Sequence, residues 1–301
     1  MTSAAAVVVL LVGGTAACGE GAASDPASAN EGSPEVEVTP VEAVAKAAAD
    51  SARITSLRYR VTGSVPEWGR LNAEASMRTA PMTMGMKLNA TGRYGGDRLE
   101  LRFVDGAMYV HGDAVDSAKL KGASWFRAEP AAWGQDLFDN QSFGLLPRQL
   151  EGSPVVQSAM LTAAEDVRRI GTETVDGAPT THYKGTVTSE GIGAARDAAT
   201  DKAARERQID GLGQFSAMRL EGTLTMDLWV GDDGRTKRFR MRGDTYASRG
   251  GADGEPLEIV DGEPLDMTIT FLDVNEPVTV EAPPVDDTAD LGELADEMRP
   301  D

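Results

Sequence analysis

Cysteine and histidine are the side chains best suited to act as nucleophiles, bases or metal ligands, and this chain has few of them. It contains one cysteine, Cys18, and two histidines, His111 and His182. A zinc site or a Ser-His-Asp triad needs a histidine with well-placed partners, and neither histidine lies in an HxxxH or HxxEH pattern. The sequence has no G-x-S-x-G elbow, Ser-x-x-Lys pair or P-loop. We expect each histidine to be a strand residue with satisfied hydrogen bonds, and we expect no enzyme, no metal and no other cofactor.

Two further stretches imitate known binding motifs. Gly191-Ile-Gly193-Ala-Ala-Arg196 follows a strand pattern and opens a helix, as a dinucleotide fingerprint does, but Arg196 replaces the third glycine. Residues 253–266, DGEPLEIVDGEPLD, carry six carboxylates without the spacing of a twelve-residue calcium loop. We interpret the first as an ordinary helix start and the second as a solvated acidic loop. An enzyme is the least favoured class, because no nucleophile–base pair is visible. Paired carboxylates for glycoside hydrolysis stay an open alternative, although no aromatic sugar platform accompanies any acidic pair.

The position of Cys18 suggests a use for its thiol. An unbroken apolar run, AAAVVVLLV at residues 4–12, is followed by five small residues and then by Cys18. This order is typical of a secretory signal peptide, and the run is shorter than the roughly 20 residues that span a bilayer. Ala16-Ala17-Cys18 resembles the end of a bacterial lipobox, in which the cysteine becomes the lipidated N-terminus. The alternative is a plain signal peptide with an incidental cysteine.

Composition and charge limit the partners and divide the chain. The net charge is −19 with no basic tract, which argues against nucleic acid and against an anionic membrane surface. Residues 1–17 are the expected signal peptide, and residues 18–38 are small, polar and acidic, as in a disordered tether. We expect one folded domain over residues 39–284 and a frayed acidic tail over 285–301. These features predict a protein on the extracytoplasmic face of the cell membrane, held by lipid on Cys18 and without a disulfide.

The periodicity of apolar residues predicts an α+β fold. Thr39-Pro40-Val41-Glu42 has the pattern of a capping box that opens a helix, and Ser153-Pro154 and residues 194–209 predict further helices. Elsewhere apolar and polar residues alternate, which favours antiparallel strands with one wet face. Pairs such as Asp105-Gly106 and Asp176-Gly177 mark tight hairpin turns. We expect about ten strands from eleven candidate segments, at residues 57–64, 70–79, 82–91, 98–104, 107–112, 165–175, 181–188, 222–231, 235–243, 265–274 and 276–284.

One face of the first strands is unusually rich in methionine. Met82, Met84 and Met86 alternate along one strand, and methionine side chains adapt to irregular apolar partners. Many other inward positions are small, so something must fill the space beside the sheet: a helix, which would make a core, or a lipid, which would make a carrier. Alternation alone predicts the residues that would line such a space, namely Leu57, Tyr59, Val61, Leu71, Met77, Met82, Met84, Met86, Leu88, Leu99, Leu101 and Phe103.

Three segments resemble one family of envelope lipoproteins. RRIGTETVDGAPTTHYKGTVT at 168–188, LWVGDDGRTKRFRM at 228–241 and VTVEAPP at 278–284 are similar in pattern and turn placement to the LppX/LprG type of actinobacterial lipoproteins, within the LolA-like superfamily. The resemblance implies a curved antiparallel half-barrel with helices on its concave side. Characterised members carry acylated lipids, lipoglycans or the acyl chains of lipoproteins there. No polar motif of the family transfers residue by residue, and only Cys18 carries over.

These observations together predict a membrane-anchored, non-enzymatic carrier. Its ligand would be a lipid or lipoglycan whose acyl chains, palmitate for example, enter the concave face of the sheet. The alternative is a surface lipoprotein whose sheet is a plain core and whose outer face binds a partner protein. In either case we expect a monomer.

Overall fold

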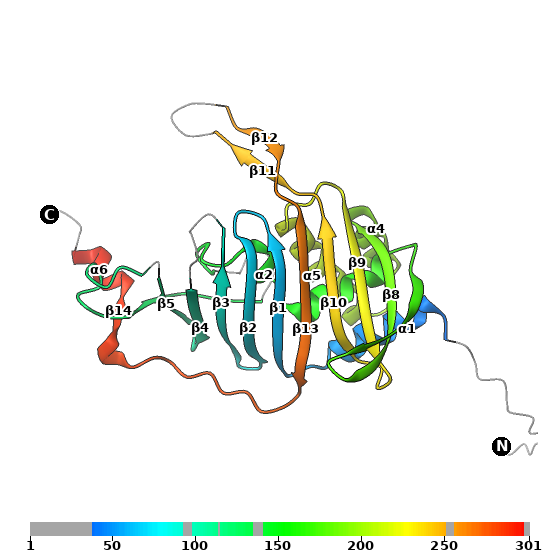
Figure 1. Cartoon of the computed structure of the whole chain (residues 1–301), viewed down its shortest axis with the longest axis horizontal. Helices are drawn as coiled ribbons and strands as arrows, with labels where there is room; N and C mark the ends of the chain where they lie inside the picture. Colours follow the sequence, from blue (N-terminus) through cyan, green and yellow to red (C-terminus); the bar gives the residue numbers. More distant parts are fainter. Residues whose placement is uncertain (1–37, 93–97, 114, 135–140, 251–255, 298–301) are drawn as a thin grey trace, which may run out of the picture. The chain divides into compact units, whose positions relative to one another are not determined.

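The computed structural model of the protein describes residues 38–92, 98–113, 115–134, 141–250 and 256–297 (Figure 1). The expected signal peptide, Cys18 and nearly all of the expected tether lie outside the described residues. No helix among the described residues has the length and apolar character needed to cross a bilayer.

The described chain is organised around one curved, open sheet of twelve strands. Every neighbouring pair is antiparallel except β14–β6, which is parallel. In spatial order the strands are β14 (Thr288–Asp290), β6 (Trp125–Ala128), β5 (Ala107–Gly112), β4 (Arg98–Val104), β3 (Met82–Ala90), β2 (Gly69–Thr79), β1 (Ser56–Val65), β13 (Leu265–Val274), β10 (Thr236–Gly243), β9 (Thr223–Gly231), β8 (Ala178–Thr188) and β7 (Arg168–Val175). The predicted α+β class with a curved, mostly antiparallel sheet is confirmed.

Alternation along the sequence is what gives the sheet two different faces. In β2 every second residue from Leu71 to Met77 is buried, and the residues between them are exposed or half-buried. Asp105 and Gly106 have φ values of 52° and 74°, the left-handed pair that a tight hairpin requires, and they join β4 to β5 as predicted. One face of the sheet is therefore apolar and must be covered, whereas the other tolerates water.

Six α-helices occur among the described residues. They are α1 (Pro40–Ser51), α2 (Arg148–Glu151), α3 (Pro154–Ala159), α4 (Ser189–Ala198), α5 (Lys202–Ala217) and α6 (Leu291–Glu297), with 3-10 helices at Met160–Ala163 (η1) and Val285–Asp287 (η2). The capping box is present at α1, and Ser153 precedes α3, as predicted. The predicted single helix at 194–209 is in fact two, because Asp201 accepts a hydrogen bond from the Ala204 amide and starts α5 anew.

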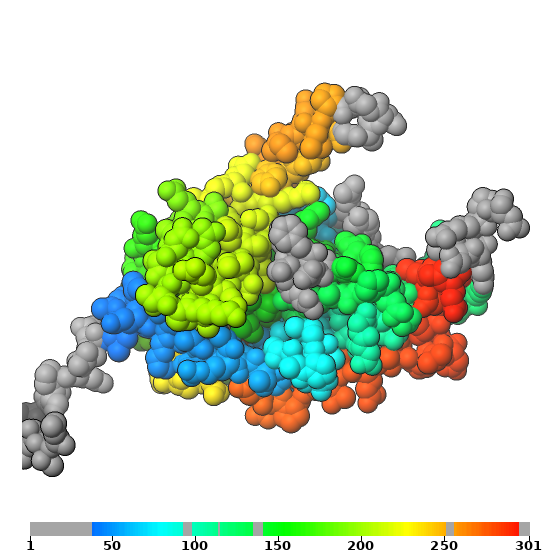
Figure 2. All heavy atoms as spheres, turned by 180° about the vertical axis from the view of Figure 1, so that it is seen from behind, coloured from blue at the N-terminus to red at the C-terminus, as the bar shows by residue number. Residues whose placement is uncertain are grey.

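Helices α1 to α5, together with buried loop residues such as Trp133 and Leu146, cover the apolar face. Seen from behind, α1 is drawn in blue and α4 with α5 in yellow-green, and they lie over the sheet (Figure 2). Side chains from both layers form one apolar cluster, in which Val44 of α1 and Phe215 of α5 join Met86 and Leu101 of the sheet. The opposite, open face carries polar and charged side chains.

The C-terminal segment departs from the predicted strand and tail. Residues 276–284 form no strand but an extended strap on the open face, where Val280 lies against Gly85 and the Arg102 guanidinium donates to the Glu281 carbonyl at 2.9 Å. The expectation of a frayed tail is wrong for residues 285–297, because β14 pairs with β6 and Asp290 binds Arg127 at 2.7 Å. Strand β14 has only three residues, which is too short for alternation of apolar and polar residues to reveal it in the sequence.

A short hairpin also interrupts the predicted acidic loop. Strands β11 (Tyr246–Arg249) and β12 (Glu258–Asp261) form a separate two-stranded sheet that projects beyond the end of the main sheet (Figure 1). Residues 251–255 of the acidic stretch lie outside the described residues.

Loss of volume beneath the helices should destabilise the domain strongly. Leu101 is fully buried in the apolar cluster, so Leu101→Ala should lower the free energy of unfolding by about 2–5 kcal/mol. Asn89→Ala, at an exposed position of the neighbouring strand, should change it by less than about 0.5 kcal/mol. Urea unfolding followed by circular dichroism measures both, and equal effects would contradict the assignment of the covered face.

Candidate functional site

A large cavity lies at the end of the sheet from which hairpin β11–β12 extends. Its volume is about 960 Å³, and we call it the mouth cavity. Its walls come from the turn between β1 and β2, from residues 141–152 around α2, from the C-terminal end of α5, and from both strands of the hairpin. Pockets of about 300–1,000 Å³ are the size that binds organic ligands, so the mouth cavity is a candidate binding site.

The mouth cavity has a mixed lining. Trp68, Leu146 and Met218 supply apolar surface. Charged residues of both signs surround it, namely Glu67, Arg148, Glu151, Arg219, Arg249, Asp261 and Glu263. Such a lining suits a molecule that has both polar and apolar parts, and it gives no strong preference for an anion or a cation.

The twelve residues predicted to line a lipid space lie on the covered face of the sheet and do not line the mouth cavity. Eleven of them are buried, and Met82 is half-buried. All twelve belong to the apolar cluster or pack against it. The side of the sheet to which alternation assigned them agrees with their burial, and their contact with a ligand stays a prediction.

One member of this set carries a polar group into the cluster. Tyr59 is 1% exposed, and burial raises the pKa of its phenol well above the ordinary value. The hydroxyl therefore stays neutral at any physiological pH.

Sequence reasoning missed the residues that do line the mouth cavity. Residues 141–152 lie where alternation is lost, and lining residues 260–263 fall in the stretch 253–266 that was expected to be a solvated acidic loop. One signal was present in the sequence: Gln149, Gln157 and Gln214 fall among apolar residues of helical segments, and all three are buried. Glutamine is mostly an exposed residue, so buried glutamines mark a place where polar groups need partners.

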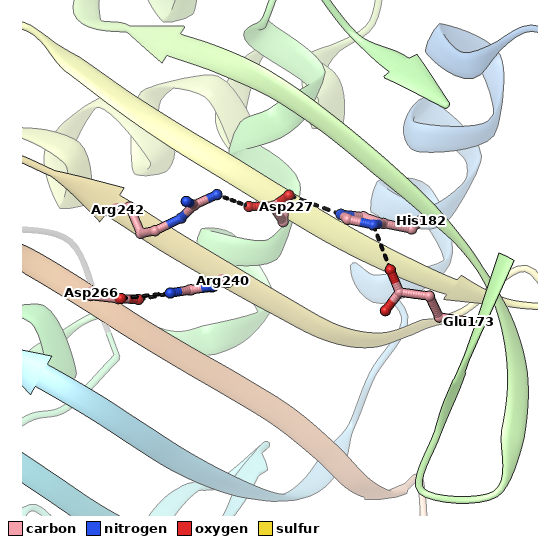
Figure 3. A network of polar contacts seen from close by, with 6 residues as sticks. All are labelled: Glu173, His182, Asp227, Arg240, Arg242 and Asp266. Carbon is pink, nitrogen blue, oxygen red and sulfur yellow. Dashed lines mark hydrogen bonds and ion pairs between the residues drawn. The ribbon is translucent and has the colours of Figure 1, made fainter. Parts of the chain in front are cut away.

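A second cluster of polar groups spans four strands on the open face (Figure 3). The His182 ring on β8 lies between two carboxylates, with Nδ1 2.9 Å from Glu173 Oε1 and Nε2 2.8 Å from Asp227 Oδ1. Asp227 on β9 also accepts a short hydrogen bond from Arg242 on β10. The His182 ring stacks on Trp229 with a centroid distance of 4.3 Å, and the Trp229 indole donates to Glu173 at 2.9 Å.

The arrangement resembles part of a catalytic triad but lacks its reacting group. Among the described residues, each ring nitrogen of His182 contacts a carboxylate oxygen, and neither contacts a hydroxyl or thiol group that could act as a nucleophile. The cluster is therefore best explained as a cross-strand bracket that joins edge strand β7 to β8, β9 and β10.

The other histidine has a simpler contact. The Nδ1 atom of His111 lies 2.9 Å from the Ser124 carbonyl oxygen, and its ring stacks on Trp125. Both histidines are thus strand residues with hydrogen bonds, as predicted. Among the described residues, no group of three or more histidine, cysteine or acidic side chains is arranged to hold a metal ion.

A neighbouring ion pair adds charge-dependent stability to the open face. Arg240 forms two hydrogen bonds with Asp266, at 2.7 and 2.6 Å, and these bonds hold the pKa of the Asp266 carboxyl below its usual range. The pKa of Asp266 in the folded protein is thus lower than its value of about 4 in the unfolded chain. The stabilisation is present above that unfolded value and is lost as the pH falls through the folded pKa.

The comparison of sequences returns one curated relative without an assigned function. No family model matches the chain. A protein from Streptomyces griseus, described as an uncharacterized 31.2 kDa protein in the rplA-rplJ intergenic region, is 27% identical over 220 residues. The match covers 70% of this chain and 62% of that protein, so the chain spans less than two thirds of the relative's length.

The comparison of structures returns mycobacterial lipoproteins. LprF from Mycobacterium bovis is 14% identical, with 81% of this chain and 96% of that chain covered and a TM-score of 0.49. The lipoprotein LppX from Mycobacterium tuberculosis is 14% identical, with 80% and 98% covered and a TM-score of 0.41. The comparison thus returns the LppX type that the sequence resemblance named. Likenesses at these identities and TM-scores assign no ligand, partner or activity to this chain.

The bracket around His182 should be a structural element whose loss is costly. The Asp227 side chain is 6% exposed, and Asp227→Ala would leave Arg242 and His182 without their shared acceptor, at a cost of about 1.5–3 kcal/mol. Asp266→Ala removes a carboxylate that is 46% exposed and should cost about 1 kcal/mol or less. Urea unfolding at pH 7 measures the loss in the free energy of unfolding for each of the two variants. An Asp227→Ala protein as stable as Asp266→Ala would show that the bracket does not hold the strands together.

Proposed function

We propose that this chain is a lipid-anchored protein of the extracytoplasmic membrane face that binds amphiphilic ligands. The observation that carries the proposal is the mouth cavity, which lies at the end of a long apolar face. A polar headgroup would occupy the cavity, and the acyl chain would extend from it between sheet and helices. No enzymatic step is part of this function.

The polar half of such a ligand matches the lining of the mouth cavity. The cavity combines Trp68 and Met218 with arginines and carboxylates, and its volume of about 960 Å³ accommodates a headgroup with the first part of a chain. Ligand pockets typically use a few polar groups to orient a ligand and apolar surface to hold it.

The apolar half would enter the cluster beneath α1 to α5. This cluster is closed to water, so an acyl chain needs the helices to move away from the sheet before it can contact residues such as Met84, Met86 and Leu101. Methionines at this contact favour such a change, because their unbranched side chains repack against irregular partners. Burial of a chain contributes about 0.8 kcal/mol for each methylene group, which offsets the lost contacts between sheet and helices.

The N-terminal features complete the proposal. The apolar run at residues 4–12 and the small residues before Cys18 support export and lipidation, and residues 18–38 support a tether of about twenty residues. The anchor would keep the mouth cavity within reach of the membrane from which a ligand comes. The monomeric state stays a prediction.

A second candidate function is a protein-interaction module, and the surface of the hairpin favours it. Leu257 and Ile259 are both 63% exposed, on or beside β12, and the apolar face of the sheet is already filled by helices. Exposed aliphatic side chains on a projecting hairpin are typical of protein contacts. In this case the domain would bind a partner protein and no lipid.

Filling the mouth cavity should abolish ligand binding. Ala247 of β11 lines the cavity, so Ala247→Trp should lower the occupancy by lipid at least tenfold, while Ile259→Trp on the same hairpin, outside the lining, should leave it unchanged. Native mass spectrometry of the full chain bearing Cys18→Ser, purified from a lipid-containing host and then incubated with phospholipids and fatty acids, measures the bound mass. A clean ligand-free mass in the unblocked protein would favour the interaction module.

Anchoring depends on a single residue and is tested separately. Cys18→Ser removes the only thiol, so the protein should move from the detergent phase to the aqueous phase in a detergent phase-partition assay. The matched change Ser24→Ala, in the expected tether, should leave the protein in the detergent phase. Membrane retention of the Cys18→Ser protein would contradict lipidation as the anchor.

A further inference from the structure

Three buried glutamines form part of the inner wall of the mouth cavity. Gln149 on α2, Gln157 on α3 and Gln214 on α5 are 4%, 1% and 5% exposed, and all three line the cavity. A glutamine amide has two N–H donors and an oxygen that accepts hydrogen bonds. Buried amides are normally satisfied by neighbouring protein groups or by bound molecules.

Two of these amides keep an oxygen without a partner. The Gln157 Nε2 atom donates to the Gln149 carbonyl oxygen at 2.9 Å, and this bond leaves Oε1 on the other side of the amide. Within the described part of the chain, neither Gln157 Oε1 nor Gln214 Oε1 has a hydrogen-bond partner, and both oxygens are buried. An unsatisfied buried acceptor costs roughly 1–3 kcal/mol, so two on one cavity wall call for an explanation.

Gly152 lies beside both amides. A Cβ atom at this position would lie 2.5 Å from Gln214 Oε1 and 2.7 Å from Gln157 Nε2, and Gly152 itself lines the cavity. Its φ of −79° is one that any residue adopts, so the backbone does not require glycine here. What requires glycine is the space that the two amide groups occupy.

We propose that the mouth cavity recognises a headgroup that carries free hydroxyl groups, and that Gln157 and Gln214 accept hydrogen bonds from them. This inference rests on the proposed function and names the chemistry of its ligand. The terminal torsion of a glutamine is soft, so a small rotation turns each oxygen toward the cavity. Glycerol, a sugar or another polyol would supply the same donors.

Other headgroups fit these two oxygens less well. An anion brings only acceptors, which an amide oxygen repels. An ammonium group brings a full charge that two neutral amides do not balance, and the carboxylates elsewhere in the lining, such as Asp261 and Glu263, would attract it instead. A hydroxyl donates one hydrogen bond without a charge, which is what two neutral acceptors require.

A pair of probes with the same chain isolates the headgroup. 1-Monopalmitoylglycerol has two free hydroxyl groups, and methyl palmitate has none. The full chain with Cys18→Ser is incubated with an equimolar mixture, and native mass spectrometry gives the ratio of the two bound masses. The unmodified cavity should favour monopalmitoylglycerol by about tenfold or more, because each neutral hydrogen bond changes an affinity by roughly five- to tenfold.

Substitutions assign the preference to the glutamines. Gln214→Met keeps the size of the side chain and removes the acceptor, so the ratio should fall by about five- to tenfold while binding of methyl palmitate is kept. Gln208→Met is the control on the same helix, because Gln208 bonds Thr162 and does not line the cavity. If Gln214→Met fails to fold, Gly152→Ala replaces it, since the added methyl group displaces both amides and should lower the ratio in the same way.

The outcomes separate this inference from the proposed function. Binding of both probes at equal strength, or a preference that Gln214→Met and Gly152→Ala leave intact, would overturn the role of the glutamines and leave amphiphile binding in place. Binding of neither probe by the unmodified cavity would overturn the proposed function and this inference with it.

Discussion

Burial of one apolar face is the interaction on which the rest of this structure depends. A twelve-stranded sheet that does not close into a barrel exposes every second side chain of most of its strands on one side. Water would oppose that exposure at about 25 cal/mol for each square ångström, so the face must be covered. Helices α1 to α5 and the buried loop residues Trp133 and Leu146 supply the cover, and with it the apolar cluster that stabilises the domain. The positions of the mouth cavity and of the polar face both follow from where this cover ends.

The cover stops at the end of the sheet where the chain turns from α2 into α3 and where α5 finishes. Polar backbone and side chains gather at that boundary, and the hairpin β11–β12 adds a further wall. Because the apolar cover ends at this boundary, the cavity there is lined by both apolar and polar groups. The same boundary explains why the glutamines are buried there: they lie on helices that face the sheet but are too near its end to meet only apolar neighbours.

The open face is stabilised by polar contacts between strands. Its side chains remain next to water, and neighbouring strands are joined by charged pairs such as Arg240 with Asp266 and by the bracket around His182. These pairs lie across strands that are distant in sequence, so they fix register as well as adding stability. The strap at residues 276–284 then crosses this face and delivers β14 to the far edge of the sheet, where it shields β6.

The sequence by itself determined the alternating strands, the turns such as Asp105-Gly106, the start of α1, and the side of the sheet on which Met84, Met86 and Leu101 lie. These features depend on neighbours within a few residues, and local periodicity and turn chemistry report them directly. Only the tertiary structure decided that helices fill the apolar face, that Glu173, His182 and Asp227 form one bracket, and that Gln157 and Gln214 meet over Gly152. It also decided that residues 276–284 form a strap and that residues 285–297 continue the fold. Each of these depends on contacts between segments far apart in the chain, and periodicity can tell which way a side chain points but not what packs against it.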